Sequence, residues 1–294
     1  MTRFGLRAHD FGKLPLTQLA DTLSAYAPAS IQLALAKALS DTPSFPSALS
    51  PGYARRLGAA FSKKNIDIAV LGCYFNPIHP DPDAREAGLK RFEAHLRFVR
   101  DMGCAIVGTE TGSCSADCSF HPDTDSPAAF DSLIKSLERL LRTAERFGAI
   151  VGIEAVAHQH TVSTIPKLVE VLRRLDSPNL QVIYDPVNLL PYEGLPESDG
   201  TILAVPSIKA QQDFFRQAFD QFGDRIVAVH LKDFRYDHGK KLGDLPALTG
   251  NLDTQGLLNL LVQRKPFVDI LLENSDPATA RITLATLQRM NATP

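Results

Sequence analysis

The chain has 294 residues, of which 44% are hydrophobic and 22% are charged, and its formal net charge is −2. A chain of this kind can bury a sizeable core, and the near-neutral charge without a basic run argues against a nucleic-acid partner. No apolar stretch reaches the ~18–20 residues that span a bilayer, and the opening MTRFGLRAHDFG lacks the long hydrophobic region of a signal peptide. We therefore expect a cytoplasmic protein that binds neither nucleic acid nor a membrane.

Eight short apolar runs follow one another along the chain, as is typical of buried parallel strands. In chain order they cover Phe4–Ala8, Ile31–Leu35, Ile66–Tyr74, Ala105–Thr109, Ile150–Glu154, Leu180–Asp185, Ile226–Leu231 and Phe267–Leu272.

Between these runs, apolar residues recur every three or four positions, which predicts amphipathic helices. The predicted helices are Leu16–Tyr26, Ala84–Met102, Ala128–Phe147, Ile165–Leu175, Ile208–Phe222, Thr254–Arg264 and, after the eighth run, Pro277–Met290. Asp81-Pro82 and Ser126-Pro127 are start signals. Gly103, Gly148 and Gly223 are predicted to end three helices as left-handed caps.

Eight alternating strand and helix units predict the α/β class and a (β/α)8 TIM barrel, formed as a single domain over residues 1–294. A barrel core of about 250 residues leaves room for insertions, and Pro186–Pro206 and Phe234–Asp253 are long enough to hold them. The alternative is a doubly wound open sheet, in which ligands from four successive strands would not converge. No GxGxxG or Walker pattern supports a nucleotide site.

The four cysteines add little chemistry. Cys73 and Cys104 lie in or beside apolar runs and are expected to be buried. Cys114 and Cys118 are four residues apart without a second pair, so zinc binding and a loop disulfide are both minor hypotheses there.

Four of the predicted strands end in side chains that can bind a metal: Glu154, Asp185, His230 and Glu273. Singly, each has another interpretation, such as a salt bridge, a helix cap or a packed histidine. Together they occupy the carboxyl ends of strands five to eight, which lie on one arc of a barrel mouth. Carboxylates with one imidazole suit Mn²⁺, Mg²⁺, Co²⁺ or Fe²⁺, and they also bind Zn²⁺.

The order Glu, Asp, His, Glu on strands five to eight resembles the sugar and sugar phosphate isomerases and epimerases of the xylose isomerase-like TIM barrels. The segments VHLKD (229–233) and ILLEN (270–274) carry this resemblance, which extends from GLRAHDFG (5–12) over nearly the whole chain. It implies that Glu154, Asp185, His230 and Glu273 bind a divalent metal, with Mn²⁺ as the first expectation. In the ketose 3-epimerase branch, Glu154 and Glu273 would also be the catalytic acid/base pair.

The resemblance implies an isomerase or epimerase acting on a small sugar or sugar phosphate. Such an enzyme removes a proton next to a carbonyl, and the metal stabilises the resulting enediolate. Three alternatives stay open: an inositol-type dehydratase on the same ligands, a phosphodiesterase of the AP-endonuclease type, and a barrel without activity. The phosphodiesterase would need about three clustered zinc ions and many more ligands. The sequence leaves open whether the protein forms a homo-oligomer.

One position departs from the family pattern. Many members have a histidine three residues after the strand-six aspartate, where this chain has Asn188. Asparagine can hydrogen-bond a hydroxyl group but cannot transfer a proton. Either this branch does not need the histidine, or His158 or His160 has taken its role. His160 is the preferred substrate contact, and Asn188 is a second expected contact.

Further polar residues at strand ends are candidates for the substrate site. Lys232 is expected to pair with a carboxylate or a substrate oxygen, and Asp233 to orient a metal ligand. Glu110 is expected to accept a substrate hydroxyl or to bridge to Lys232. Arg235 is a candidate for a substrate phosphate, with an exposed loop arginine as the alternative. His9, Asp10, Gln32 and Asn76 lie at the ends of the first three strands.

Overall fold

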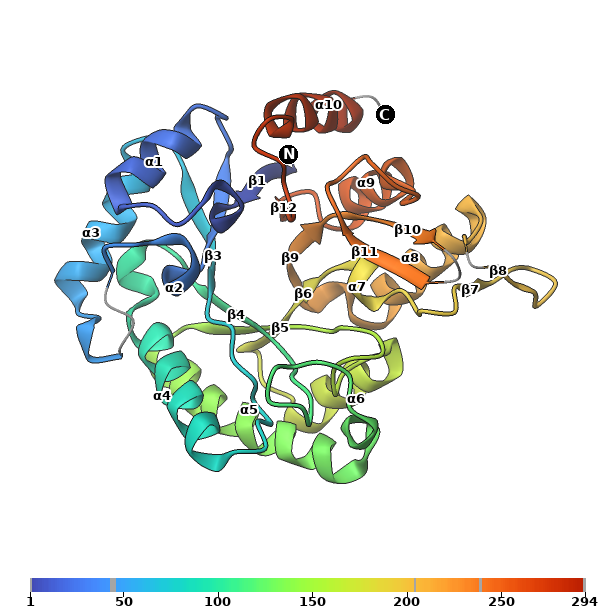
Figure 1. The fold of residues 1–294 in the computed structure, drawn as a ribbon, viewed down its shortest axis with the longest axis horizontal. Helices are drawn as coiled ribbons and strands as arrows, with labels where there is room; N and C mark the ends of the chain where they lie inside the picture. Colours follow the sequence, from blue (N-terminus) through green and yellow to red (C-terminus); the bar gives the residue numbers. More distant parts are fainter. Residues whose placement is uncertain (1, 43–45, 204, 238–239, 293–294) are drawn as a thin grey trace.

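A closed barrel of eight parallel strands forms the centre of the molecule (Figure 1). The structure is a computed structural model and describes residues 2–42, 46–203, 205–237 and 240–292. The barrel strands are β1 (Arg3–Arg7), β2 (Ser30–Leu33), β3 (Asp67–Gly72), β4 (Ile106–Glu110), β5 (Ile150–Glu154), β6 (Leu180–Tyr184), β9 (Ile226–Leu231) and β12 (Asp269–Leu272). Each predicted strand overlaps one of these. The barrel closes because β1 pairs with both β2 and β12, which confirms the (β/α)8 prediction and excludes the open sheet.

Helices surround the barrel in a ring (Figure 1). They are α1 (Leu16–Ser24), α2 (Leu35–Ala38), α3 (Pro51–Ser62), α4 (Pro82–Phe98), α5 (Pro127–Phe147), α6 (Ile165–Leu175), α7 (Pro186–Leu189), α8 (Ile208–Phe222), α9 (Thr254–Arg264) and α10 (Ala280–Ala292). Short 3₁₀ helices lie at Ala8–Phe11, Pro46–Ala48, Arg100–Met102, Pro122–Asp125 and Gly223–Arg225.

Side-chain caps begin several of these helices. The carboxylate of Asp81 and the hydroxyl of Ser126 accept hydrogen bonds from the first turns of α4 and α5, as predicted. Helix α3 was not among the predicted helices. Its signal is Ser50-Pro51, because the Ser50 hydroxyl accepts a bond from the backbone N–H of Tyr53 and proline occupies the first turn.

Two of the three predicted glycine caps are confirmed. Gly103 and Gly148 have φ values of 79° and 63°, the left-handed conformation that glycine adopts without a steric penalty. The prediction for Gly223 is wrong. Its φ of −54° and ψ of −38° are right-handed, because the chain continues from α8 into the 3₁₀ turn Gly223–Arg225.

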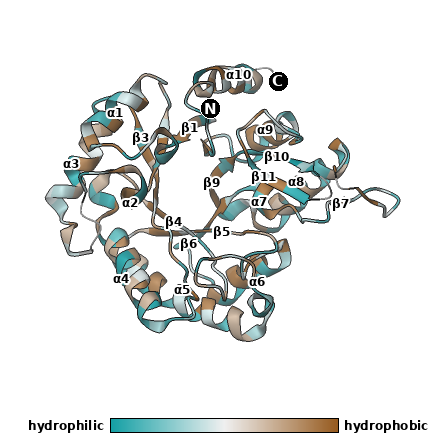
Figure 2. Ribbon diagram, viewed as in Figure 1, coloured by the Kyte–Doolittle hydropathy of each residue, from teal (hydrophilic) through white to brown (hydrophobic). Residues whose placement is uncertain are grey.

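The interior of the barrel is packed with side chains. Val70, Ile183, Ala228 and Leu271 from four strands form one inner cluster. A Cβ on Gly108 would lie 2.6 Å from the Cδ1 atom of Ile183, so glycine there leaves room for this layer. A larger apolar cluster joins the outer face of the barrel to the helices, and the central strands are mostly hydrophobic in Figure 2. The barrel is therefore a rigid base for its loops.

The two long loops contain structure of their own. The segment after β6 forms α7 and a small hairpin of β7 (Leu195–Pro196) and β8 (Ile202–Leu203), which projects from the body in Figure 1. The segment after β9 forms an antiparallel hairpin of β10 (Asp233–Asp237) and β11 (Lys240–Leu245). Both insertions follow the carboxyl ends of strands, where barrel enzymes keep their active sites.

The cysteines carry no cross-link. Cys73 and Cys104 are buried, as predicted, and all four cysteines are free thiols, so Cys114 and Cys118 form no disulfide. No helix in the described part of the chain is long and apolar enough to cross a membrane.

Candidate metal centre

The four predicted ligands come together at one end of the barrel. Glu154 is the last residue of β5, Asp185 follows β6, His230 lies in β9 and Glu273 follows β12. The pairing of Leu271 with His230 and the hydrogen bond from the N–H of Glu273 to the Leu231 carbonyl align β9 and β12. One ligand atom from each of the four side chains lies within 4.8 Å of the other three.

Burial makes this cluster unusual. The four residues are 2%, 2%, 0% and 4% exposed in the order Glu154, Asp185, His230, Glu273. Three carboxylates at such burial are costly unless a cation compensates them. Within the described ranges, this is the single group of three or more histidine, cysteine and acidic residues placed to hold a metal ion. In particular, Cys114 and Cys118 belong to no such group.

The unsatisfied polar atoms of the cluster fit a bound cation. Nε2 of His230 is buried and has neither a hydrogen bond nor an ion pair within the described residues, while Oδ2 of Asp185 and Nδ1 of His230 have ion pairs but no hydrogen bond there. Buried polar groups are nearly always satisfied, so such atoms call for an explanation. Ligand atoms within 4.8 Å of one another can all lie 2.0–2.6 Å from one ion, which is the usual range for divalent metals in proteins. The donor set therefore fits a divalent cation.

Lys232 contributes a buried positive charge between two of the ligands. Its Nζ atom lies 3.2 Å from Oδ2 of Asp185 and 3.4 Å from Oε2 of Glu273. The predicted pairing of Lys232 with a carboxylate is therefore present. The predicted alternative, a bridge from Glu110 to Lys232, is absent from the ion pairs of the described residues. Burial raises the pKa of Asp185, and the charge of Lys232 opposes that increase.

The pKa values of His230 and Glu273 shift in opposite directions. Burial lowers the pKa of His230, but the carboxylates of Glu273 and Glu154 outweigh it and raise the pKa to about 9. The Nδ1 atom of His230 lies 3.0 Å from Oε2 of Glu154 and 3.4 Å from Oε1 of Glu273. For Glu273, burial raises the pKa, but His230, Lys232 and Arg7 together hold it well below its usual range. Glu273 is therefore ionised at neutral pH.

Arg7 supports Glu273 from the neighbouring strand. Its Nη1 atom lies 3.2 Å from Oε1 of Glu273, and its Nε atom lies 2.7 Å from Oδ1 of Asp10. Arg7 also donates a hydrogen bond to the side-chain oxygen of Asn274, while Asp10 accepts one from the backbone N–H of Ser275. The closure of β1 against β12 thus fixes the segment that carries Glu273.

Asn188, the position that departs from the family pattern, contacts the predicted ligand Glu154 directly. Its side-chain Nδ2 donates a 2.6 Å hydrogen bond to Oε1 of Glu154, and its backbone N–H donates to Oδ1 of Asp185. His160 is buried, and its Nε2 atom lies 3.9 Å from Oε2 of Glu110, at the end of β4. These residues surround the cluster on the β4–β6 side. Their roles as substrate contacts stay predictions.

Asp233 and Arg235 lie in the hairpin that follows β9. Oδ1 of Asp233 accepts bonds from the backbone N–H groups of Phe234 and Leu252, at 2.8 and 2.9 Å. These bonds join the start of the hairpin to the chain that returns from it. Arg235 is exposed on β10, opposite Leu242 of β11. The structure therefore does not bring the Arg235 side chain into the buried cluster.

Several polar residues around the mouth were not predicted from the sequence. Besides Arg7, they are Lys37 and Tyr74, which contact each other with the Lys37 Nζ atom 4.3 Å from the ring centroid. The Tyr74 hydroxyl accepts a hydrogen bond from the side chain of Gln32 on β2. Burial and then the charges of Glu273 and Glu154 raise the pKa of Tyr74 well above 10. The sequence signal that could have identified Tyr74 is its position at the end of the apolar run Ile66–Tyr74.

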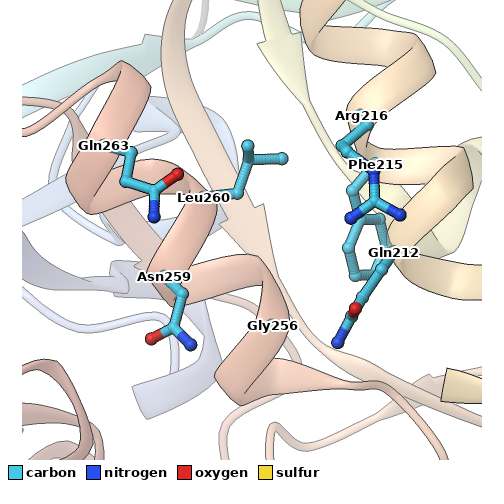
Figure 3. A pocket seen from close by; sticks show the side chains of 7 residues that line it. All are labelled: Gln212, Phe215, Arg216, Gly256, Asn259, Leu260 and Gln263. Atoms are coloured by element: carbon cyan, nitrogen blue, oxygen red, sulfur yellow. The ribbon is translucent and has the colours of Figure 1, made fainter. Parts of the chain in front are cut away.

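Of two hollows in the structure, one lies next to the four-residue cluster and the other lies away from it. One of about 390 Å³ lies at the mouth, between the loops after β5 and β6 and the strand β11, and includes Asn188 and Asp244. Another of about 180 Å³ lies between α8 and α9, where Leu260 points across the gap toward the side of α8 that carries Gln212 and Arg216 (Figure 3). This second hollow is lined by residues of the outer helices, so it is separate from the strand ends.

Comparisons with known proteins agree with this architecture. The xylose isomerase-like TIM barrel family model matches residues 29–290. The inosose dehydratase of Geobacillus kaustophilus (strain HTA426) is 28% identical over 195 residues, which cover 62% of this chain but only 54% of that protein. The crystal structure of 3-keto-D-glucoside 4-epimerase from E. coli superposes with a TM-score of 0.68 and 18% identity, over 98% of this chain and all of that one.

The D-psicose 3-epimerase of Clostridium cellulolyticum H10, solved with D-tagatose, has a TM-score of 0.69 and 12% identity, over 98% of this chain and 99% of that one. At these identities the two solved structures show a shared fold. The family model covers far more than half of the sequence, and the eight-stranded barrel agrees with it. The chain therefore belongs to the xylose isomerase-like TIM barrel family.

Proposed function

We propose that this protein is a divalent-metal-dependent isomerase or epimerase of a small sugar or sugar phosphate. The observation that carries the proposal is the buried cluster of Glu154, Asp185, His230 and Glu273, all at the carboxyl ends of barrel strands. These residues would hold the metal, for which Mn²⁺ is our first expectation because carboxylate oxygens predominate in the donor set. The epimerases among the structures with the same fold are consistent with this chemistry.

The residues of the cluster suit proton transfer next to a carbonyl. A bound divalent cation would polarise the carbonyl group and thereby acidify the neighbouring C–H bond. Glu273, held ionised by its cationic neighbours, would accept that proton. The carboxylates of Glu154 and Glu273 both approach the Nδ1 atom of His230, at 3.0 and 3.4 Å. Two separate carboxylates so close together would allow one to take the proton and the other to return it to the opposite face of the carbon.

The neighbouring residues would orient the Glu154 and Glu273 carboxylates and bind the substrate. Asn188 fixes one oxygen of Glu154 by its 2.6 Å hydrogen bond, which leaves the orientation of that carboxylate defined. Lys232 would donate to negative charge that develops on a substrate oxygen, because its ammonium group is buried between Asp185 and Glu273. His160 and Glu110 would contact substrate hydroxyl groups from the other side.

A dehydratase acting on the same residues is the second candidate. The similarity to an inosose dehydratase favours it, although the match spans about half of that protein's length. It would begin with the same proton abstraction and then expel a hydroxyl group instead of returning a proton. By contrast, one four-residue cluster within the described part of the chain gives little support to a phosphodiesterase with three zinc ions.

Metal analysis followed by a deuterium-exchange screen tests the proposal. The protein is stripped with a chelator, reloaded separately with Mn²⁺, Mg²⁺, Co²⁺ or Zn²⁺, and incubated in deuterated water with ketoses, ketose phosphates and inososes. We expect deuterium at the carbon next to the carbonyl, only in a metal-loaded protein. Epimerised or isomerised product indicates the leading function, and loss of water indicates the dehydratase. A fully loaded protein that exchanges no proton in any of these compounds would contradict both.

A further inference from the structure

The hollow at the barrel mouth is large enough to hold a substrate group of its own. We call it the distal cavity: the space of about 390 Å³ whose polar lining comes from Gln159, Asn188, Tyr192, Lys241 and Asp244. Typical small-molecule sites measure roughly 300–1,000 Å³. Its walls are the loop after β5, the insertion after β6 and the strand β11 of the insertion after β9, so it is formed by loops and not by the barrel strands.

Two contacts place the distal cavity directly beside the metal centre. Asn188 lines the cavity and also donates its hydrogen bond to the ligand Glu154. Asp244 lines the cavity and lies 3.8 Å from the Nζ atom of Lys232, which pairs with Asp185 and Glu273. A substrate bound at the four ligands could therefore extend into this space without leaving the mouth of the barrel.

The positive charge in the distal cavity, on Lys241, is already hydrogen-bonded within the protein. Lys241 is the sole cation among its described lining residues. Its ammonium group donates to the carbonyl oxygens of Val187 and Leu190, at 2.8 and 2.5 Å, and lies 5.0 Å from the ring centroid of Tyr192. The carboxylate of Asp244 is exposed at the opening and would repel an anion. The cavity is therefore poorly suited to a phosphate group.

Aromatic rings lead from the cavity wall to the rim. Tyr192 lies 4.8 Å from the ring of His158, which stacks on Phe120 at 4.3 Å with an interplanar angle of 3°. The three rings come from the loops after β4, β5 and β6, and Phe120 is 52% exposed. His158 has a φ of 67°, a conformation that non-glycine residues rarely adopt. Flat aromatic surfaces of this kind can pack against the C–H face of a pyranose ring.

We propose that the distal cavity binds an uncharged, hydroxylated ring that is joined by a glycosidic bond to the sugar at the metal centre. The substrate would then be a keto-disaccharide or another keto-glycoside instead of a free monosaccharide or a sugar phosphate. The amides of Gln159 and Asn188 and the carboxylate of Asp244 supply hydrogen-bonding groups for hydroxyls, and the tyrosine supplies an apolar face. This inference rests on the proposed function, because it names the substrate class of the same site.

The first test compares four ketoses in the deuterium-exchange assay of the Mn²⁺-loaded protein. Fructose, lactulose, palatinose and fructose 6-phosphate share a fructose unit with a free C3–H, but only lactulose and palatinose carry a second ring. We expect kcat/KM for at least one disaccharide to exceed that for fructose and for fructose 6-phosphate by about tenfold or more. A preference for fructose or for its phosphate over both disaccharides would overturn the inference and leave the proposed function intact.

A variant of β11 tests whether the cavity is the cause of that preference. A Cβ at Gly243 would meet Val187 and Lys241 at 3.4 and 3.5 Å, which is ordinary contact, so alanine is a matched control of small size. Gly243→Leu should reduce the ratio of disaccharide to fructose kcat/KM at least tenfold, whereas Gly243→Ala should change it less than threefold. Equal ratios in wild type and Gly243→Leu would assign the preference to another surface.

Direct binding separates this inference from the proposed chemistry. Saturation-transfer NMR with the Mg²⁺-loaded protein and lactulose reports which ring contacts the protein, whether or not turnover occurs. We expect saturation of the galactose-ring protons in wild type and its loss in Gly243→Leu. Saturation without proton exchange in any ketose would contradict the proposed function and retain the subsite. Absence of saturation on the galactose ring would overturn the subsite.

Discussion

The arc of the barrel mouth formed by β5, β6, β9 and β12 differs in charge from the arc formed by β1 to β4. The first arc carries three carboxylates, His230 and Lys232 in one buried cluster. On the second arc, β1 ends at Arg7 and β4 at Glu110, but three other groups near the strand ends, His9, Gln32 and Tyr74, stay neutral near pH 7. Burial lowers the pKa of His9 to about 4 and raises that of Tyr74 well above 10, and Gln32 carries no charge.

This difference has a chemical consequence. A divalent cation needs concentrated negative charge, which the first arc provides. Neutral donors and acceptors bind hydroxyl groups without competing for the cation, and the second arc provides those. Glu110 is intermediate between the two arcs. It lies beside Glu154 in the strand pairing, but burial, and then the charge of Glu273, raise the pKa of its carboxyl group and so favour its neutral form. The two arcs therefore suit different parts of one reaction.

The largest effect should come from removing Glu273, the proposed base on the first arc. Glu273→Gln removes a carboxylate and should lower the deuterium-exchange rate on the order of 10²–10⁴-fold, as for loss of a general base. The matched change Glu110→Gln, on the other arc, should lower it less than about tenfold, because we expect Glu110 to hold a hydroxyl and not to take the proton. Exchange rates of both variants should be measured at full metal loading. Comparable losses would show that the two arcs do not divide the work in this way.

The sequence was sufficient to predict that Glu154, Asp185, His230 and Glu273 lie together, because each stands at the end of a local apolar run. The eightfold alternation then places the ends of neighbouring runs side by side, as the confirmed barrel shows. Arg7 could not be found in this way. Its contact with Glu273 depends on the closure of β1 against β12, which joins the two ends of the chain. The bond between Asn188 and Glu154 likewise depends on how α7 turns after β6.

The distal cavity was also beyond sequence reasoning, for a different reason. The loops after β6 and β9 were predicted to be long, and their position at the barrel mouth was correct. Lys241 and Asp244 lie in β11, whose sequence KKLGDL (240–245) does not alternate apolar and polar residues, although that of its partner β10, DFRYD (233–237), does. Without that pattern the register of a hairpin is not specified by sequence alone. The cavity follows from the packing of the loop after β5 against the two insertions.

Arg7 connects the two arcs, and its removal should have the next largest effect. Arg7→Met leaves Glu273 and Asp10 without their buried cation, which should lower the free energy of unfolding by about 3 kcal/mol and activity by roughly 10–100-fold. Arg3→Met on the same strand is the control. Arg3 pairs with Asp67 at the surface, so its loss should cost less than about 1 kcal/mol. Urea denaturation measures both. Equal costs would mean that Arg7 is only another surface arginine.

The smallest expected effect concerns His9, the titratable residue that distinguishes the neutral arc most directly. Burial, with the charge of Arg7 and then Lys37, lowers its pKa from 6.5 to about 4 in the folded protein. The unfolded chain therefore binds more protons between pH 6.5 and 4, and the stability that neutral His9 contributes above pH 6.5 is lost as the pH falls through this range. With an allowance for its partial exposure, the loss by pH 5 is about 1 kcal/mol. His9→Gln should be less sensitive to acid by that amount, in urea denaturation of the metal-free protein at pH 7.5 and pH 5. Identical acid sensitivity in the two proteins would show that His9 is protonated as easily in the barrel as in water, and the contrast between the arcs would then rest on Tyr74 and Gln32 alone.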